Sequence, residues 1–408
     1  MNRWKNYIIP AFYHIRHNLS FAIFYVLGTA LAFVFIAIVL QLVYSVVGNE
    51  PPMVNADRIV CVDEFLDPQG TPLYKISAKE VSGFMEEIQG YDLYAVSHTE
   101  IADVFGEHTF ITRPVNYVNA DYWNVFQFEF QEGRAFSRQE FDKKQPVAVI
   151  DKSMADILFK EESAVGKKIE CQKVASTITG VVKDVSIFTT GISGKFWLSD
   201  KYNTFTPSGD RFYEIYVLFP DEMPVIAAKQ GIVRVVKNYY SRQGEEVDVS
   251  AETLYTMRES LIRRVGVRLL AYGVPVVLLL LLVIPAINIM TLNVANSNKQ
   301  SEEIAIRRAI GAPRSALFFQ MMTENLILVV VGVFFGLLLF FPMVYWIEEV
   351  CVNGVTGGTD SLVTDINSLV ILGGIFPLML VFTLLTGGCS ACLAVRKNMA
   401  VVLKGGAE

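Results

Sequence analysis

The segment SEEIAIRRAIGA, Ser301–Ala312, carries four charged side chains between two long apolar runs. Such side chains stay in water or against a polar partner, so neither run can bury the segment. Ser301 can cap a short helix at its start, and Gly311 can end it in a left-handed turn. The sequence therefore predicts a short amphipathic helix at a membrane surface. This helix could dock a partner or could be an ordinary solvated turn between two spans, and the charge spacing alone favours the turn.

Composition points to a membrane protein with a water-soluble portion. Apolar residues make up 52% of the 408 residues, charged residues make up 19%, and the formal net charge of −6 gives no reason to expect a nucleic acid partner. A hydrocarbon core of about 30 Å needs about 20 helical residues to cross it. Four uncharged stretches are long enough: Leu19–Val47, Leu269–Val294, Asn325–Ile347 and Ser368–Val395. We therefore expect four transmembrane helices in a 1+3 arrangement around a large insert.

Positive charge predicts the orientation of these spans. Lys and Arg are concentrated in both terminal flanks and in the loop 296–323, whereas the loop 348–367 carries none. The positive-inside rule places both termini and the charged segment in the cytoplasm, and it places residues 48–266 outside the cytoplasmic (inner) membrane. Four arginines at the outer end of the second span disagree with the rule, which long translocated domains weaken: Arg258, Arg263, Arg264 and Arg268. We expect that span to extend as a helix into the external domain.

The insert has an α+β pattern. Runs rich in β-branched and aromatic residues predict strands at Arg58–Phe65, Val147–Ile150, Ser176–Val182 and Tyr213–Phe219. Helical spacing predicts helices at Ala78–Ile88, Lys152–Phe159 and Pro224–Tyr240, the first two with Ser77 and Asp151 as N-caps. The expected organisation is a cytoplasmic segment 1–18, a span 19–47, an extracytoplasmic domain 48–266, a span 267–295, a cytoplasmic loop 296–323, a span 324–347, an outer loop 348–367, a span 368–395 and a cytoplasmic tail 396–408.

Motifs that carry chemistry are missing from this sequence. It contains no GxxxxGK[ST] phosphate loop, no HExxH metal pair and no GxSxG nucleophile turn, so we expect neither a catalytic site nor a metal or cofactor in this chain. Cys61 and Cys171 could form one disulfide, although sequence does not establish that they are close.

Small and polar residues inside the spans predict helix packing. Gly332 and Gly336 form a GxxxG pair that favours close contact between helices, within the chain or in a dimer. Asn288 and Asn293 are expected to form hydrogen bonds between helices rather than a transport site.

The stretch Ile287–Gly336 resembles the signature of MacB/FtsX-type ABC transporter permeases. In that family a span ends in INIM, here Ile287–Met290, and the inner loop ends roughly in EIGIRRAIGA, here Glu303–Ala312. A glutamate, here Glu324, opens the next span. The external segment Tyr117–Phe141 resembles the family's stretch ending in GRxF. Three positions depart from the pattern, two of them in the inner loop: Gln300 for Arg, Ala305 for Gly and Met399 for Pro.

The resemblance implies a mechanism in which the charged segment is a coupling helix. Such permeases act as dimers, here a homodimer or a pair with a related permease, and each chain binds a separate cytoplasmic ATPase subunit that holds ATP and Mg²⁺. ATP-driven motion of that subunit is transmitted to the extracytoplasmic domain, a process called mechanotransmission. The coupling residues implied are Glu302, Glu303, Ile304, Ile306, Arg307, Arg308, Ile310 and Gly311, with the charged residues at the rim of the ATPase groove and the isoleucines as apolar anchors.

The resemblance also implies a two-lobed external domain and a choice of outputs. The second lobe is expected near residues 116–201. Efflux or export of a peptide, antibiotic or envelope component, with a periplasmic adaptor and an outer-membrane channel, is the favoured output. Regulation of extracytoplasmic cell-wall hydrolases without transport is the alternative, and lipoprotein release is a further one.

Overall fold

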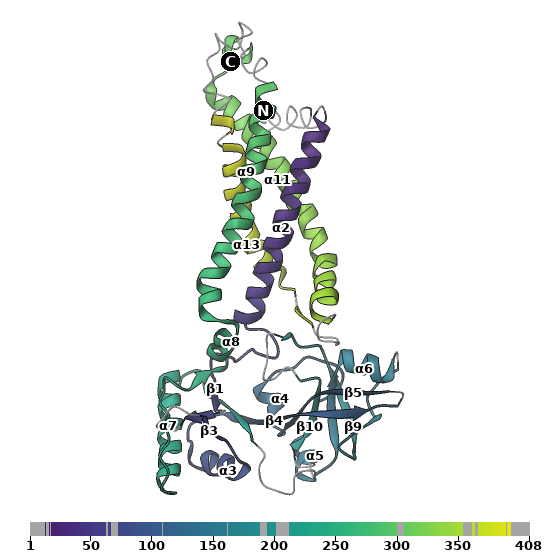
Figure 1. Ribbon diagram of the computed structural model, residues 1–408, viewed down its shortest axis with the longest axis vertical. Helices are drawn as coiled ribbons and strands as arrows, with labels where there is room; N and C mark the ends of the chain where they lie inside the picture. Colours follow the sequence, from purple (N-terminus) through teal and green to yellow (C-terminus); the bar gives the residue numbers. More distant parts are fainter. Residues whose placement is uncertain are drawn as a thin grey trace. The chain divides into compact units, whose positions relative to one another are not determined.

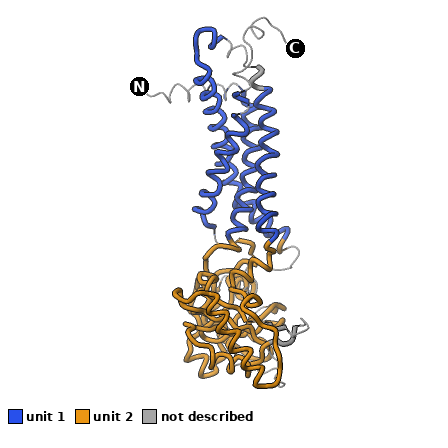
Figure 2. The backbone as a smooth tube through the Cα atoms, turned by 90° about the vertical axis from the view of Figure 1, so that its left-hand side faces the viewer, with its two compact units in different colours: residues 1–44, 268–351, 365–408 blue, residues 45–267, 352–364 orange. Residues whose placement is uncertain are grey.

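A computed structural model describes the chain except for residues 1–12, 14–15, 17, 63, 67–71, 108, 161, 188–193, 201–211, 300–305, 354–360, 364–365, 389 and 393–408. The chain divides into two compact units, coloured separately in Figure 2. The membrane unit comprises residues 1–44, 268–351 and 365–408, and the α+β unit comprises residues 45–267 and 352–364.

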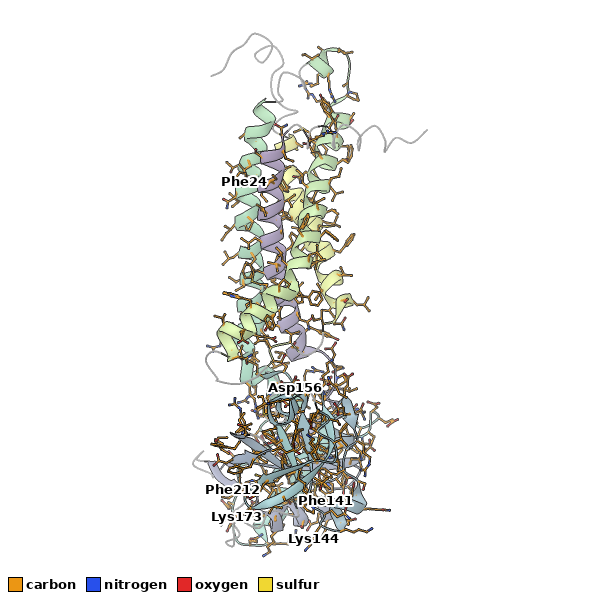
Figure 3. All side chains as sticks on the ribbon, turned by 90° about the vertical axis from the view of Figure 1, so that its right-hand side faces the viewer. Phe24, Phe141, Lys144, Asp156, Lys173 and Phe212 are labelled. Carbon is orange, nitrogen blue, oxygen red and sulfur yellow. The ribbon has the colours of Figure 1, made fainter. Side chains whose placement is uncertain are left out.

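Four long apolar helices account for the membrane unit, and they confirm the predicted 1+3 arrangement. They are α2 (Leu19–Val47), α9 (Val274–Lys299) after a π-helical turn η3 (Leu269–Gly273), α11 (Arg314–Ile347) continued by η4 (Glu348–Asn353), and α13 (Ser368–Thr383) continued by η5 (Leu384–Gly388). Exposed apolar side chains such as Phe24 line the outside of the bundle (Figure 3). This outward apolar surface suits lipid, so the chain is a multi-span membrane protein.

A ten-stranded mixed sheet forms the centre of the α+β unit (Figure 1). Its main path runs β12-β1-β11-β4-β5-β10-β7-β9-β6, and β8 pairs with β4 and β9. The strands are β1 (Ile59–Val62), β4 (Leu93–Phe105), β5 (Phe110–Val118), β6 (Phe130–Gly133), β7 (Val147–Asp151), β8 (Lys168–Cys171), β9 (Val174–Val182), β10 (Phe196–Ser199), β11 (Glu214–Leu218) and β12 (Tyr255–Thr256). A separate hairpin joins β2 (Glu64–Leu66) and β3 (Pro72–Lys75), and the helices are α3 (Ala78–Glu87), α4 (Tyr122–Val125), α5 (Arg138–Asp142), α6 (Lys152–Phe159), α7 (Val225–Ser241) and α8 (Met257–Val265).

Among the described residues, two hydrophobic cores lie on this sheet. The first joins residues from both ends of the insert, among them Val60, Phe84 and Val236. The second is built from residues between Ala102 and Leu198. The long strand β4 contributes to both cores, so the two lobes share a continuous sheet rather than meeting at a hinge loop.

Local sequence signals predicted several of these elements correctly. Helix α3 begins after Ser77, whose side chain forms a capping box with Glu80, and α6 begins after Asp151, whose carboxylate accepts a hydrogen bond from the backbone N–H of Met154 at 2.9 Å. The strands expected at Val147–Ile150, Ser176–Val182 and Tyr213–Phe219 are confirmed as β7, β9 and β11.

The GRAF stretch, Gly133–Phe136, has a structural explanation. Gly133 has a φ of +67°, and a Cβ there would lie 2.2 Å from the carbonyl oxygen of Thr179. Arg134 donates two 2.8 Å hydrogen bonds to the carboxylate of Glu140, whose side chain also caps α5. These hydrogen bonds lower the pKa of Glu140 to about 2. The stretch therefore fixes the turn between β6 and α5.

The disulfide considered between Cys61 and Cys171 is not formed. Both residues are buried thiols. Cys61 lies on β1 with its Sγ 3.5 Å from the Sδ of Met257, whereas Cys171 belongs to the second core with its Sγ 3.6 Å from the hydroxyl of Tyr117. Cys61 lies on β1 in one lobe and Cys171 lies on β8 in the other. Their positions in the sequence do not reveal this separation.

Candidate functional site

The segment that precedes α11 is described from Ile306 onward, so the predicted coupling residues Glu302, Glu303 and Ile304 lie outside the described residues. Residues 306–309 are helical, and the N–H of Ile310 donates to the carbonyl of Ile306 at 3.1 Å. Gly311 has a φ of +103°, which is the left-handed conformation that the sequence predicts for the end of this helix. Pro313 then precedes α11 as its N-cap.

Two isoleucines of this helix are exposed on the same side. Ile306 is 51% exposed and Ile310 is 82% exposed, and their i, i+4 spacing places them on one face. Arg307 instead turns toward α11, where its Nη1 donates to the Oε1 of Gln320 at 3.1 Å. This hydrogen bond ties the helix to the longest membrane helix of the chain and leaves the isoleucine pair open to a partner.

A buried polar cluster joins all four membrane helices. It lies near the C-terminal end of α9 and in the N-terminal half of α11, the two helices that flank the segment carrying Ile306 and Ile310. Asn293 of α9 donates from its amide to the side-chain oxygen of Asn325 at 3.1 Å and to the carbonyl of Thr386 at 2.8 Å. Tyr25 of α2 donates to the Asn325 oxygen and also lies 3.0 Å from the Thr386 hydroxyl. Asn325 of α11 donates to the carbonyl of Thr383 on α13 at 3.1 Å.

The cluster leaves little room for other side chains. Tyr25 and Thr386 are fully buried, and a Cβ on Gly387 would lie 2.5 Å from the amide nitrogen of Asn325. Hydrogen bonds between membrane helices each contribute about 0.6 kcal/mol on average and up to about 1.7 kcal/mol. Asn325 bonds to residues of the three other membrane helices.

The GxxxG pair packs within the chain. A Cβ on Gly332 would lie 2.6 Å from the Cβ of Thr29, and one on Gly336 would lie 2.8 Å from the carbonyl oxygen of Ala30. The two glycines therefore let α11 approach the backbone of α2 closely, which is the packing alternative raised by the sequence.

The structure separates the two asparagines expected to join helices. Asn293 does so, whereas Asn288 is exposed on α9. Sequence reasoning did not identify Tyr25, Asn325 or Thr386 as partners of Asn293. The sequence does show that each of them is a polar side chain near the end of an apolar run. It does not show which of them meet, because the hydrogen bond from Tyr25 to Asn325 spans 300 positions of sequence.

Two protein families match this chain. Residues 22–235 match the family described as MacB-like periplasmic core domain, and residues 275–399 match the family described as FtsX-like permease C-terminal. The first match covers more than half of the chain and the second contains both the exposed isoleucine pair and most of the polar cluster.

Individual relatives are distant. The chain is 26% identical over 236 residues to "Macrolide export ATP-binding/permease protein MacB" of Hahella chejuensis, covering 56% of this chain and 34% of the relative. A protein of the same description from Neisseria gonorrhoeae is 26% identical over 247 residues, covering 59% of this chain and 37% of that protein. The chain thus spans about a third of the length of these relatives.

Solved structures give weaker likenesses. The periplasmic region of MacB from Actinobacillus actinomycetemcomitans aligns with a TM-score of 0.40 at 16% identity, covering 48% of this chain and 91% of that structure. The extracellular domain of the ABC-type transporter YknZ from Gram-positive bacteria aligns with a TM-score of 0.39 at 15% identity, covering 47% of this chain and 99% of that structure.

Proposed function

The chain belongs to the MacB/FtsX family of ABC transporter permeases, and from that premise we propose that it transmits the ATP-driven motion of a separate ATPase subunit to its α+β unit. In this proposal ATP and Mg²⁺ bind to the partner subunit, and this chain receives motion through the helix that carries Ile306 and Ile310. The output we favour is efflux or export of a peptide, an antibiotic or an envelope component. The description "macrolide export" belongs to the relatives, and it supports export here only as a class of activity.

The exposed isoleucine pair is the observation that carries this proposal. An apolar side chain that is 82% exposed next to a membrane helix gains free energy when a partner covers it, at roughly 25 cal/mol per Å² of apolar area buried. The neighbouring Arg308 suits an acidic rim around the partner's groove, whereas Arg307 bonds to α11. A short helix that ends at Gly311 and is tied to α11 by Arg307 can pass the partner's displacement directly to a membrane helix.

The route from this helix through the membrane unit supports the same proposal. A displaced α11 pulls on Asn325, and Asn325 bonds to residues of the other three helices. The close packing of Gly332 and Gly336 on α2 adds a second connection between α11 and the helix that leads into the α+β unit. Orientation with both termini in the cytoplasm, and assembly as a homodimer or with a related permease, are part of the proposal.

Substitution of Ile310 by aspartate tests the docking role. We expect affinity purification of tagged wild-type protein in mild detergent to recover an ATPase subunit, and we expect Ile310→Asp to reduce that recovery at least tenfold because it places a charge in an apolar contact. Ser315→Asp is the matched control, since it adds the same charge at another exposed position five residues later.

Equal recovery with Ile310→Asp and with Ser315→Asp would contradict the docking role. Failure to recover any ATPase with wild-type protein would remove the premise of an ATP-driven partner. The other proteins recovered also bear on the output: an adaptor would support export, and a cell-wall hydrolase would support the regulatory alternative.

A further inference from the structure

Arg258 joins two segments of the α+β unit that lie far apart in sequence. The unit begins with the last residues of membrane helix α2, residues 45–47, and its helix α8 precedes the next membrane helix in the chain. Arg258 lies in the first turn of α8 and bonds to Gly48, 210 positions earlier. One side chain therefore connects the entry of the chain into this unit with its exit.

The guanidinium group of Arg258 donates to three residues of the entry segment, which comprises residues 48–57. Its Nη1 donates to the carbonyl oxygen of Gly48 at 2.9 Å, and its Nε and Nη2 donate to the two carboxylate oxygens of Asp57 at 3.0 and 3.2 Å. Nη2 also donates to the side chain of Asn49. The Arg258 side chain is 11% exposed, so these hydrogen bonds form largely out of water, and the planar fork of an arginine suits such a divided set of acceptors.

The same turn of α8 is fixed to the sheet and to another helix. Thr256 and Glu259 form a capping box at the start of α8, and Glu259 accepts a 2.6 Å hydrogen bond from Lys229 of α7. Strand β12, which ends at Thr256, pairs with β1. A displacement of α8 therefore reaches both the edge of the sheet and α7.

The C-terminal end of α8 allows the backbone to change direction. Gly266 ends the helix with a φ of +104°, a conformation that a residue with a side chain rarely adopts. Arg263 is stacked on the ring of Tyr255 at 4.0 Å, whereas Arg264 is exposed. Of the four arginines that disagree with the positive-inside rule, Arg258 is thus the one that is buried.

We propose that Arg258 is a positioning residue that makes the segment after α2 and helix α8 move as one body, so that motion of either connection is delivered to the sheet. This inference rests on the proposed function, because it concerns how the delivered motion enters the α+β unit. A residue that only stabilised the fold would, when replaced, lower the melting temperature without changing how the correctly folded protein moves.

The first experiment measures the joint itself and needs no ATPase. Spin labels are attached to Val47→Cys and Ser260→Cys in the full chain in lipid nanodiscs, with the three cysteines of the membrane unit, Cys351, Cys389 and Cys392, replaced by serine. We expect one narrow distance distribution in the otherwise wild-type protein. Arg258→Ala should broaden it at least twofold, Arg258→Lys should broaden it less, and Arg264→Ala, the exposed control on the same helix, should leave it unchanged. A narrow distribution in Arg258→Ala would overturn the proposal.

The second experiment measures transmission with the ATPase subunit bound. Labels at Leu27→Cys in the membrane unit and Lys144→Cys in the α+β unit report a distance change when ATP is added. We expect Arg258→Ala to reduce that change to less than half while the rate of ATP hydrolysis stays within twofold of wild type, and we expect Arg258→Lys to restore part of it. An undiminished change in Arg258→Ala would contradict the inference.

The outcomes separate this inference from the proposed function. If neither the wild-type protein nor the variant shows an ATP-dependent change, the proposed function fails, whereas the first experiment still decides whether Arg258 holds the joint. If Arg258→Ala does not fold, Asp57→Asn replaces it as the test, because it removes the ion pair and leaves Arg258 bonded to Gly48 and Asn49. Asp57→Asn should then broaden the first distribution, and an unchanged width would count against the proposal.

Discussion

At the scale of single residues, Asn325 is the side chain that bonds to residues of the three other membrane helices. It is 5% exposed and its amide group exchanges hydrogen bonds with Tyr25, Asn293, Thr383 and Thr386. A buried amide in hydrocarbon must have such partners, because an unpaired one costs several kcal/mol. The arrangement therefore couples correct helix packing to the satisfaction of one side chain.

We predict that Asn325→Leu, which keeps the side-chain volume and removes the hydrogen bonds, lowers the free energy of unfolding by about 1–3 kcal/mol. The loss includes the penalty for removing one of the two acceptors of the Asn293 amide group. Reversible unfolding in mixed lipid and denaturing-detergent micelles measures it. Asn288→Leu is the control, since Asn288 is exposed on α9 and its replacement should change stability by less than about 0.5 kcal/mol. Equal effects at the two positions would contradict the prediction.

At the scale of elements, the contact between α2 and α11 depends on the absence of side chains. Gly332 and Gly336 face the backbone of α2 at distances that no Cβ can occupy without displacing a helix. In contrast, Gly373 on α13 has no atom within 4 Å of the position its Cβ would take. The three glycines therefore offer a matched comparison within one bundle.

We predict that Gly332→Ala destabilises the bundle by about 1–3 kcal/mol because the new methyl group overlaps Thr29. Gly373→Ala should be neutral or stabilising by up to about 1 kcal/mol, since alanine favours a helix where there is space. The same micelle unfolding measurement distinguishes them. A stabilising effect of Gly332→Ala would show that α2 and α11 do not approach each other in this way.

Sequence patterns predicted the elements much better than the connections between them. The apolar runs predict the four membrane helices, and Ser77 and Asp151 predict where α3 and α6 begin, because these signals act within a few residues. The long β4–β5 hairpin was not predicted, since its exposed face interrupts the apolar pattern with charged residues such as Glu100 and Asp103. The hydrogen bonds of Tyr25 in the polar cluster and those of Arg258 join residues about 200 or more positions apart, a separation that one sequence does not encode locally.

At the scale of the whole molecule, the proposed orientation places η4 outside the cytoplasm and the start of α11 inside it. Cys351 lies in η4 and is exposed, whereas Ser315 is exposed in the first turn of α11. We predict that a membrane-impermeant maleimide added to spheroplasts labels Cys351 and does not label Ser315→Cys. Each is measured in its own variant, with Cys389 and Cys392 replaced by serine in both. The Ser315→Cys variant also has Cys351 replaced. Lysed cells should label both. The reverse pattern in intact spheroplasts would invert the topology and the proposed docking side.

The order of strands in the sheet also has a consequence for how the protein is made. Strand β1 pairs with β11 and β12, so an early segment of the α+β unit must wait until residue 256 has left the ribosome before its edge of the sheet can close. The second core draws on residues between Ala102 and Leu198 and can form sooner. During this interval the apolar side chains of Val60 and Val62 lack the later residues of their core, among them Ile215, Val217 and Val236. We therefore expect this permease to need a chaperone or an insertion machinery during synthesis. That factor would keep the nascent β1 segment away from lipid until β11 and β12 have been made.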